Sequence, residues 1–302
     1  MWFRNLNIYQ LTESFQTSAD ELEQRLAEQA FTPCRGLDTH RVGWVAPLGK
    51  HGEQLTHVSN GRYMLCMRRE ERILPAAVVR EAVEDKVDAI AAEQNRHVGR
   101  KERGEIKDEI IIDLLPRAFT RSARIFAYID PANDWLIVDS ASINRAEELL
   151  SLLRESLGSL KLRPLAVNHA PTDLMTRWVL EHPPAGLEVA DECELREVSD
   201  KGGVIRMRGV DLGSREVQQH LQSGRYVARL ALEWQQRIGF LLTDDLAIRR
   251  LRFLDLVMEE AADTEADDEA MRFDADFALM AMELARFIPA LCDQLGGAQS
   301  DA

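Results

Sequence analysis

One stretch of the chain separates two kinds of sequence pattern: Leu114-Leu115-Pro116-Arg117-Ala118-Phe119-Thr120-Arg121. Before it, apolar residues recur at helical spacing. After it, aromatic and β-branched residues become frequent, as is typical of strands. A proline destabilises a helix interior, so the helical pattern is expected to end at Pro116. The stretch is therefore expected to join a helical segment to a sheet.

The segment on the N-terminal side of this joint predicts two helices. Pro75 suits the first turn of a helix, and a charged stretch from about residue 93 to 109 interrupts the apolar pattern. Apolar residues at helical spacing lie on both sides of the interruption: Val78, Val79, Ala82, Val83, Val87 and Ile90, then Ile110, Ile111, Leu114 and Leu115. Residues 75–118 are interpreted as a projecting helical pair, inserted into a sheet domain and placed outside its core.

The segments around this insertion read as strands, turns and helices of an α+β layer. Asn60-Gly61 accepts positive φ at both positions and predicts a hairpin. Residues 130–134 predict another, between two strand-like runs. Ser18-Ala19-Asp20-Glu21 forms a capping box, and Leu149 to Leu157 follow a helical pattern. We expect a central domain of residues 1–74 and 119–166, with helices on one face of a mainly antiparallel sheet.

The remaining residues, 167–302, repeat this style and predict a second α+β domain at the base. Asp200-Lys201-Gly202-Gly203 predicts a hairpin, and Ser214 can cap a helix. Three strand-like runs follow between residues 226 and 253. The acidic run from Glu259 to Asp276 is interpreted as a solvated linker that leads to a final helix from Phe277 to Leu295.

Composition indicates a protein of the cytoplasm. The chain has 302 residues, of which 45% are hydrophobic, enough for two domains with a core. No apolar run approaches the roughly 20 residues of a membrane span, and no signal-peptide core follows Met1. The four cysteines are far apart, which favours free thiols over a disulfide framework or zinc site.

A negative net charge would repel the phosphates of a nucleic acid only if it were spread evenly over the protein surface. The chain has 37 Lys and Arg against 51 Asp and Glu, a formal net charge of −14. DNA meets one face of a protein, however, so clustering of the cations decides the question.

Motifs for catalysis or cofactor binding are weak. The sequence has no Gly-rich nucleotide loop. His51 and His57 lie in a segment that reads as loop and turn, and the acidic run lacks the pattern of a calcium loop. Glu84-Asp85-Lys86 is similar to Glu-x-Lys fragments of nucleases, on a periodic helix where such triplets arise by chance. We expect no cofactor, no metal and no enzymatic activity, with a metal-dependent nuclease as the alternative.

Basic residues gather near the predicted turn of the helical pair, marked by Gly99 and Gly104. They are Arg96, Arg100, Lys101, Arg103 and Lys107. Such a cationic tip either contacts DNA phosphates or is a solvated turn. At the joint, Phe119 lies between Arg117 and Arg121, where it either packs in a core or stacks on a base while the arginines hold phosphates.

Leu114 to Phe119 also resembles the LLPRAF signature of the RdgC family of recombination-associated proteins. Further segments resemble the family in the same order along the chain: Phe31 to Cys34, Leu55 to Val58, Leu157 to Leu160, Gly202 to Arg206, Leu230 to Ile238 and Arg272 to Phe277. The resemblance spans nearly the whole chain.

This resemblance implies a horseshoe subunit that closes into a ring-shaped homodimer around DNA. It also implies binding to single- and double-stranded DNA without sequence preference, restraint of RecA-promoted recombination, and a role at the nucleoid and in replication-fork repair. A basic inner wall and an acidic outer wall would reconcile such a ring with the negative net charge.

Family members implicate residues that fall on Arg117, Phe119, Arg96 and Arg225 of this chain. A basic and polar pair of some relatives falls on Gly209 and Val210, so this chain departs from the family pattern there. Two nearby arginines could replace the pair. The full expected DNA-contacting set is Arg96, Arg100, Lys101, Arg103, Lys107, Arg117, Phe119, Arg121, Arg206, Arg208, Arg225 and Arg229.

Overall fold

The computed structural model describes residues 1–199, 202–263, 266 and 268–299. Its strands are β1 (Leu6–Leu11), β2 (His40–Trp44), β3 (Thr56–Ser59), β4 (Arg62–Ile73), β5 (Phe119–Asp130), β6 (Trp135–Asp139), β7 (Leu162–Pro164), β8 (Leu187–Arg196), β9 (Val204–Arg208), β10 (Tyr226–Trp234), β11 (Ile238–Thr243) and β12 (Ile248–Phe253). The helices are α1 (Ala19–Ala27), α2 (Ala76–Gln94), α3 (Arg100–Leu114), α4 (Ile143–Leu157), α5 (Pro171–Leu180), α6 (Arg215–Gln222), α7 (Asp255–Ala262) and α8 (Glu269–Gln294). Two 3₁₀ turns, η1 (Gly49–His51) and η2 (Leu115–Arg117), complete the regular structure of the described residues.

All twelve strands belong to one sheet, and every pairing within it is antiparallel. The order is β2-β4-β5-β6-β1-β12-β11-β10-β8-β9, while β3 pairs with β4 and β7 with β1. The strands of the two predicted domains meet between β1 and β12, where Leu6 stands opposite Ile248. The expected α+β class with a mainly antiparallel sheet is confirmed.

Both sides of the central strands are covered by helices. Ile125, Ala127 and Ile129 of β5 pack in one cluster with α1 and α4, while Tyr128 of the same strand packs in a second cluster with α5 and α8. The rings of Tyr128 and Phe277 of α8 lie 5.6 Å apart. The prediction of helices on one face is therefore wrong for this part, because these strands are apolar on both sides and need two covering layers.

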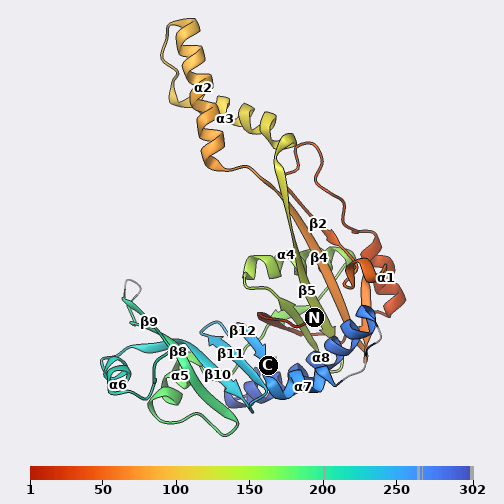
Figure 1. Cartoon of the computed structure of the whole chain (residues 1–302), viewed down its shortest axis with the longest axis vertical. Helices are drawn as coiled ribbons and strands as arrows, with labels where there is room; N and C mark the ends of the chain where they lie inside the picture. Colours follow the sequence, from red (N-terminus) through yellow and green to blue (C-terminus); the bar gives the residue numbers. More distant parts are fainter. Residues whose placement is uncertain (200–201, 264–265, 267, 300–302) are drawn as a thin grey trace.

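The long antiparallel pair β4–β5 reaches beyond both layers. Its pairing runs from Tyr63 opposite Ile129 to Ile73 opposite Phe119. At its far end the chain between the two strands forms α2 and α3, which project away from the rest of the molecule and give the chain the outline of an open C (Figure 1). A small core of Val87, Val98 and Ile106 joins these two helices.

The structure can be compared with the predicted hairpins and the predicted helix cap. The Asn60-Gly61 hairpin is confirmed, with φ of 49° and 74°. Ser18 Oγ accepts a hydrogen bond from the Glu21 amide at 3.3 Å, as expected, but the Glu21 carboxylate binds Arg25. The Asp200 to Gly203 hairpin lies partly outside the described residues.

The acidic run is not simply a linker. Its first residues belong to α7, and α8 begins at Glu269, before the expected start. The Asp268 carboxylate accepts a hydrogen bond from the Met271 amide at 2.8 Å, and acidic groups stabilise this end of a helix. Within the described residues no helix is long and apolar enough to cross a membrane.

Candidate nucleic-acid interface

The strands of the base leave one side of the sheet open. On β12, Ile248, Leu251 and Phe253 are buried against the α8 side, while Arg250 and Arg252 are exposed. On β9 the partly buried Ile205 and Met207 pack on that core, and Arg206 and Arg208, which alternate with them, are exposed. This alternation follows from the pleat, which sends successive side chains to opposite faces. It places a row of arginines on the open side.

The open side of the base continues into the side covered by α4. Arg249 of β12 donates to the Ser140 carbonyl at 2.9 Å and to Asn7 Oδ1 at 3.2 Å. Asn7 lies on β1 between Leu6 and Ile8, which belong to the α8 cluster, so its side chain is on the other side of the sheet. We call this continuous surface the α4 side.

Two glutamates of β8 hold the arginines of the base. Glu194 Oε2 accepts from Arg206 Nε at 2.8 Å and lies 3.7 Å from Arg229 Nη1, while its other oxygen binds Arg196. Burial alone would raise the pKa of the Glu194 carboxyl, but the hydrogen bonds from Arg206 and Arg196 bring it below its ordinary value. The carboxylate is therefore charged and three guanidinium groups gather on it.

Glu192 forms a second such centre. Its Oε2 accepts from Arg250 Nη1 at 2.8 Å, its Oε1 accepts from Arg250 Nη2, and Arg208 Nε lies 3.4 Å from Oε2. Hydrogen bonding to Arg250 lowers the pKa of the Glu192 carboxyl. Beside this pair lies a hollow of about 680 Å³, whose basic lining is Arg4, Arg208, Arg250 and Arg252.

On the arm made by β4 and β5, the α4 side carries the residues of the joint. Phe119 and Arg121 alternate in register with Ile125, which packs in the α4 cluster. Phe119 is 86% exposed, so of the two alternatives left by the sequence, packing in the core of its own subunit is excluded. Arg121 Nε donates to Glu71 Oε1 at 3.1 Å, and Arg117 is exposed in η2.

Glu71 is the corresponding anionic centre of the arm. Hydrogen bonds from Arg121 and Arg69 lower the pKa of its carboxyl to about 2. Arg145 of α4 also lies 3.3 Å from Glu71 Oε2. The arm therefore repeats the arrangement of the base, with several guanidinium groups on one carboxylate.

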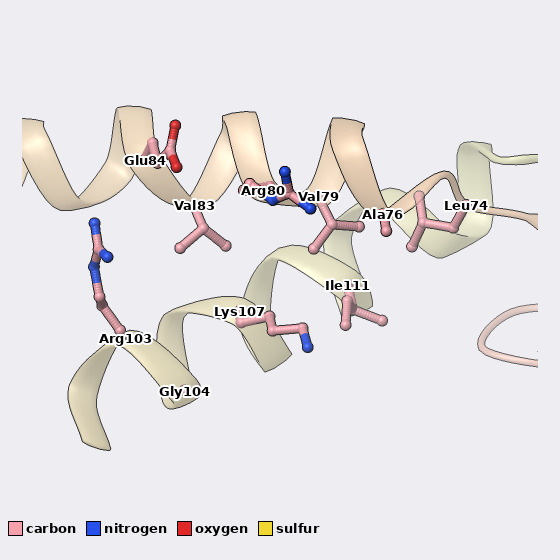
Figure 2. A pocket seen from close by; sticks show the side chains of 10 residues that line it. All are labelled: Leu74, Ala76, Val79, Arg80, Val83, Glu84, Arg103, Gly104, Lys107 and Ile111. Atoms are coloured by element: carbon pink, nitrogen blue, oxygen red, sulfur yellow. The ribbon is translucent and has the colours of Figure 1, made fainter. Parts of the chain in front are cut away.

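The cations of the helical tip form a third, separate group. Arg96 donates to both oxygens of Glu102, at 2.7 and 2.5 Å. Lys101 is almost fully exposed, 3.9 Å from Glu105. Arg103 and Lys107 line an apolar groove of about 570 Å³ between α2 and α3, together with Val79, Val83 and Ile111 (Figure 2). Arg100 is exposed at the start of α3.

The expected DNA-contacting residues thus fall into three places and not one. The base brings together Arg206, Arg208 and Arg229. Arg225, in contrast, is largely buried in an ion pair with Glu197 just before β10. Gly209 and Val210 follow β9, and their amides donate to the Asp191 carbonyl at 2.8 and 3.3 Å.

Sequence reasoning missed the contribution of β12 and its neighbours. The residues concerned are Arg4, Arg196, Arg249, Arg250 and Arg252. The alternation of arginine with Ile248, Leu251 and Phe253 was the available signal, since a strand with one apolar face exposes the residues between.

The groups considered for catalysis lie apart. Glu84-Asp85-Lys86 is on α2, and Glu84 lines the tip groove. His57 Nε2 lies 2.9 Å from Asp274 Oδ1, and His51 pairs with Glu269. No group of three or more His, Cys, Asp or Glu in the described part of the chain is arranged to hold a metal ion.

Fold and surface together define a class: an α+β protein built on one antiparallel sheet, with arginines held by glutamates along one side. The sequence model of the family described as "Putative exonuclease, RdgC" matches residues 1–298. The chain belongs to the RdgC family.

Relatives named "Recombination-associated protein RdgC" cover nearly the whole chain. One from Aeromonas hydrophila subsp. hydrophila is 45% identical over 298 residues, which is 98% of both chains. Those from Yersinia pestis (strain Pestoides F) and Yersinia pseudotuberculosis serotype O:1b are each 44% identical over 298 residues, again 98% of both chains.

Proposed function

We propose that this protein binds single- and double-stranded DNA without reading base sequence, through the α4 side of its sheet. One observation carries the proposal: exposed arginines of β9, β10 and β12 lie together on this side, although the formal net charge of the chain is −14. Guanidinium groups neutralise phosphates and release counterions, which supplies affinity that is independent of sequence.

The proposed assembly is a homodimer that closes into a ring around the DNA. The open C outline, with α2 and α3 at one end and the base at the other, suits a subunit that meets its partner at both ends (Figure 1). The apolar groove between α2 and α3, and the small core that joins them, support a contact at the tip. Because a single twofold contact would leave the assembly open, closure needs two.

The proposed biological role is restraint of RecA-promoted strand exchange at the nucleoid, and a part in recombination and replication-fork repair. The relatives' printed name, "Recombination-associated protein RdgC", supports recombination as the setting. A protein that encloses or coats DNA through backbone contacts limits access by other DNA-binding proteins, which supplies the physical basis.

The proposal includes binding without cleavage, although the printed description of the family names an exonuclease. Incubation of linear and plasmid DNA with the protein and Mg²⁺ tests this point. We expect retarded DNA of unchanged length; metal-dependent shortening or nicking would assign the nuclease function instead.

Fluorescence anisotropy with two unrelated duplexes of equal length, and one single strand, tests the binding. We expect equal affinities for the duplexes and a steep loss of affinity with salt, by about 0.9 in log–log slope for each phosphate neutralised. Native mass measured at the same concentration should give a dimer. A strong preference for one duplex, no DNA shift, or a monomeric mass would contradict the proposal.

A further inference from the structure

The hollow beside Glu192 and Arg250 differs from the neighbouring site at Glu194 in one respect. At Glu194, Arg206 uses its Nε for the carboxylate, which leaves its two terminal nitrogens for a ligand. At Glu192, Arg250 uses both terminal nitrogens, Nη1 and Nη2, on the two carboxylate oxygens. These are the nitrogens with which an arginine chelates a phosphate. Each of these nitrogens keeps a second hydrogen, but Glu192 occupies the hydrogens that lie side by side at the end of the fork and offsets the charge of Arg250, so Arg250 binds a phosphate less well while Glu192 holds it.

The backbone of β12 aims Arg250 at this place. Between the pairs Leu241–Arg249 and Gly239–Arg252, β12 has two residues where β11 has one, which makes a β-bulge at Arg250. Arg250 has a φ of 49°, a left-handed conformation that is costly for a side chain with a Cβ. Bulges of this kind re-aim side chains next to functional sites. The pairing of Leu251 N with the Arg4 carbonyl at 2.8 Å holds the bulge against the N-terminal segment.

Charge within the hollow favours an anionic ligand once the ion pair between Glu192 and Arg250 is broken. Its ionisable lining is Arg4, Arg208, Arg250 and Arg252 against Asp191 and Glu192. Arg208 and Arg250 are each half or more exposed, so they can turn toward a ligand, whereas Glu192 is only 22% exposed and stays near the sheet. Four cations around a hollow of about 680 Å³ suit the phosphodiester groups of a DNA backbone.

We propose that this hollow is a phosphodiester-binding site of the DNA interface, and that Glu192 is its built-in competitor, which occupies Arg250 until a DNA phosphate displaces it. The inference rests on the proposed DNA binding. It assigns Arg250, Arg4 and Arg252 as contacts of the DNA backbone, and it makes Glu192 a residue that weakens binding. Such a competitor keeps affinity low enough for the protein to release and move along DNA.

Glu192→Gln tests the competitor, because it removes the charge and keeps the shape. Freeing Arg250 adds one phosphate contact, so the log–log salt slope should steepen by about 0.9, which corresponds to about eightfold tighter binding at about 0.1 M salt. Glu188→Gln is the matched control: Glu188 is exposed on the same strand and the same side, and it forms no ion pair within the described residues. It should leave the salt slope unchanged and change the affinity by less than about twofold, because it frees no arginine for a phosphate.

Arg250→Ala, made in both backgrounds, identifies the arginine concerned. It should weaken DNA binding severalfold more in Glu192→Gln than in the original chain, where Arg250 is already occupied. Thermal unfolding of each variant, with Glu192→Ala as a second substitution, separates binding from folding. A weaker or unchanged affinity of folded Glu192→Gln or Glu192→Ala, an equal gain in Glu188→Gln, or an equal loss for Arg250→Ala in both backgrounds would overturn the inference. If the unsubstituted protein binds no DNA, the proposed function itself fails.

Discussion

Phe119 stands directly opposite Ile73 at the far end of the β4–β5 pair, and both side chains are exposed. Two apolar residues side by side in solvent, between a helical tip and an arginine-lined arm, form a surface suited to a partner. Stacking of Phe119 on a DNA base is one such use, and packing against a second copy during ring closure is the other.

Phe119→Ser separates these uses. Because the ring is 86% exposed, its loss should leave the melting temperature unchanged. Truncation of a core Phe, in contrast, typically lowers the free energy of unfolding by about 3–5 kcal/mol. If the ring stacks on a base, DNA affinity falls by about 1–3 kcal/mol with little change in salt slope. Phe240→Ala, at a buried position, is the destabilised control. A large fall in melting temperature of the Phe119 variant would contradict an exposed role, and a fall in dimer mass alone would assign the ring to assembly.

Arg206→Ala should weaken DNA binding by a similar factor for every sequence. It removes a side chain that is 74% exposed on the α4 side, so the magnitude of the log–log salt slope should fall by about 0.9. Arg272→Ala, on the exposed surface of α8 on the other side of the sheet, makes the same charge change and should leave the slope as it is. Equal effects of the two substitutions would indicate that overall charge, and not this surface, governs binding. Arg117→Ala and Arg96→Ala extend the test to the arm and the tip.

Glu283→Gln should destabilise the fold. Glu283 is fully buried and accepts hydrogen bonds from Arg237 at 2.7 and 3.0 Å. Glu283→Gln removes the buried charge and weakens two charge-assisted hydrogen bonds while Arg237 keeps its partner Glu260, at a cost of about 1.5–3 kcal/mol in the free energy of unfolding. Urea denaturation measures this, with Glu21→Gln of the exposed Glu21–Arg25 pair as a control expected to cost less than about 1 kcal/mol. A loss as small as that of the control would mean that Arg237 is satisfied without Glu283.

Acid should remove the stabilisation that the ionised Glu71 carboxylate gives to the fold. The pKa of the Glu71 carboxyl is lowered to about 2 in the fold, from an ordinary value of 4.5, by hydrogen bonds from Arg121 and Arg69. A lowered folded-state pKa contributes stability that is complete above the ordinary value and disappears as the pH falls from about 4.5 to about 2. Urea unfolding over this range should therefore show a smaller pH dependence in Glu71→Gln than in the original chain. Identical pH profiles would show that Glu71 gains nothing from its arginines.

The features predicted well from sequence are those that neighbours along the chain decide. Asn60-Gly61 forms its hairpin because both residues accept positive φ, whatever the rest of the molecule does. The helix-to-strand change at Pro116 was visible because proline ends a helix locally, and β5 begins at Phe119. The same reasoning failed for the acidic run, because Asp268 caps α8 two turns before the first buried residue of that helix, Phe277, so no apolar pattern marks its start.

The candidate site could be predicted only in part. The basic tip is a cluster along the sequence, so Arg96 and its neighbours were found by inspection. Arg250 was not predicted because its partner Glu192 is 58 residues away in the sequence. The β-bulge that orients Arg250 also cannot be recognised from the sequence of one strand. Arg225 is a predicted DNA contact, and its pair with Glu197, 28 residues earlier, is not visible in the sequence.

The sequence by itself determined the α+β class, the two helices between β4 and β5, and the change from helix to strand at the joint, because propensity, proline and turn residues act over a few neighbours. Only the tertiary structure decided which arginines converge. The strand order of the sheet brings the arginines of β9, β10 and β12 to one surface. The pleat of the strands, and the bulge in β12, determine the side of the sheet to which each guanidinium points. These pairings join residues far apart in the chain, so the positions of Glu192 and Glu194 among their arginines follow from how the whole sheet packs.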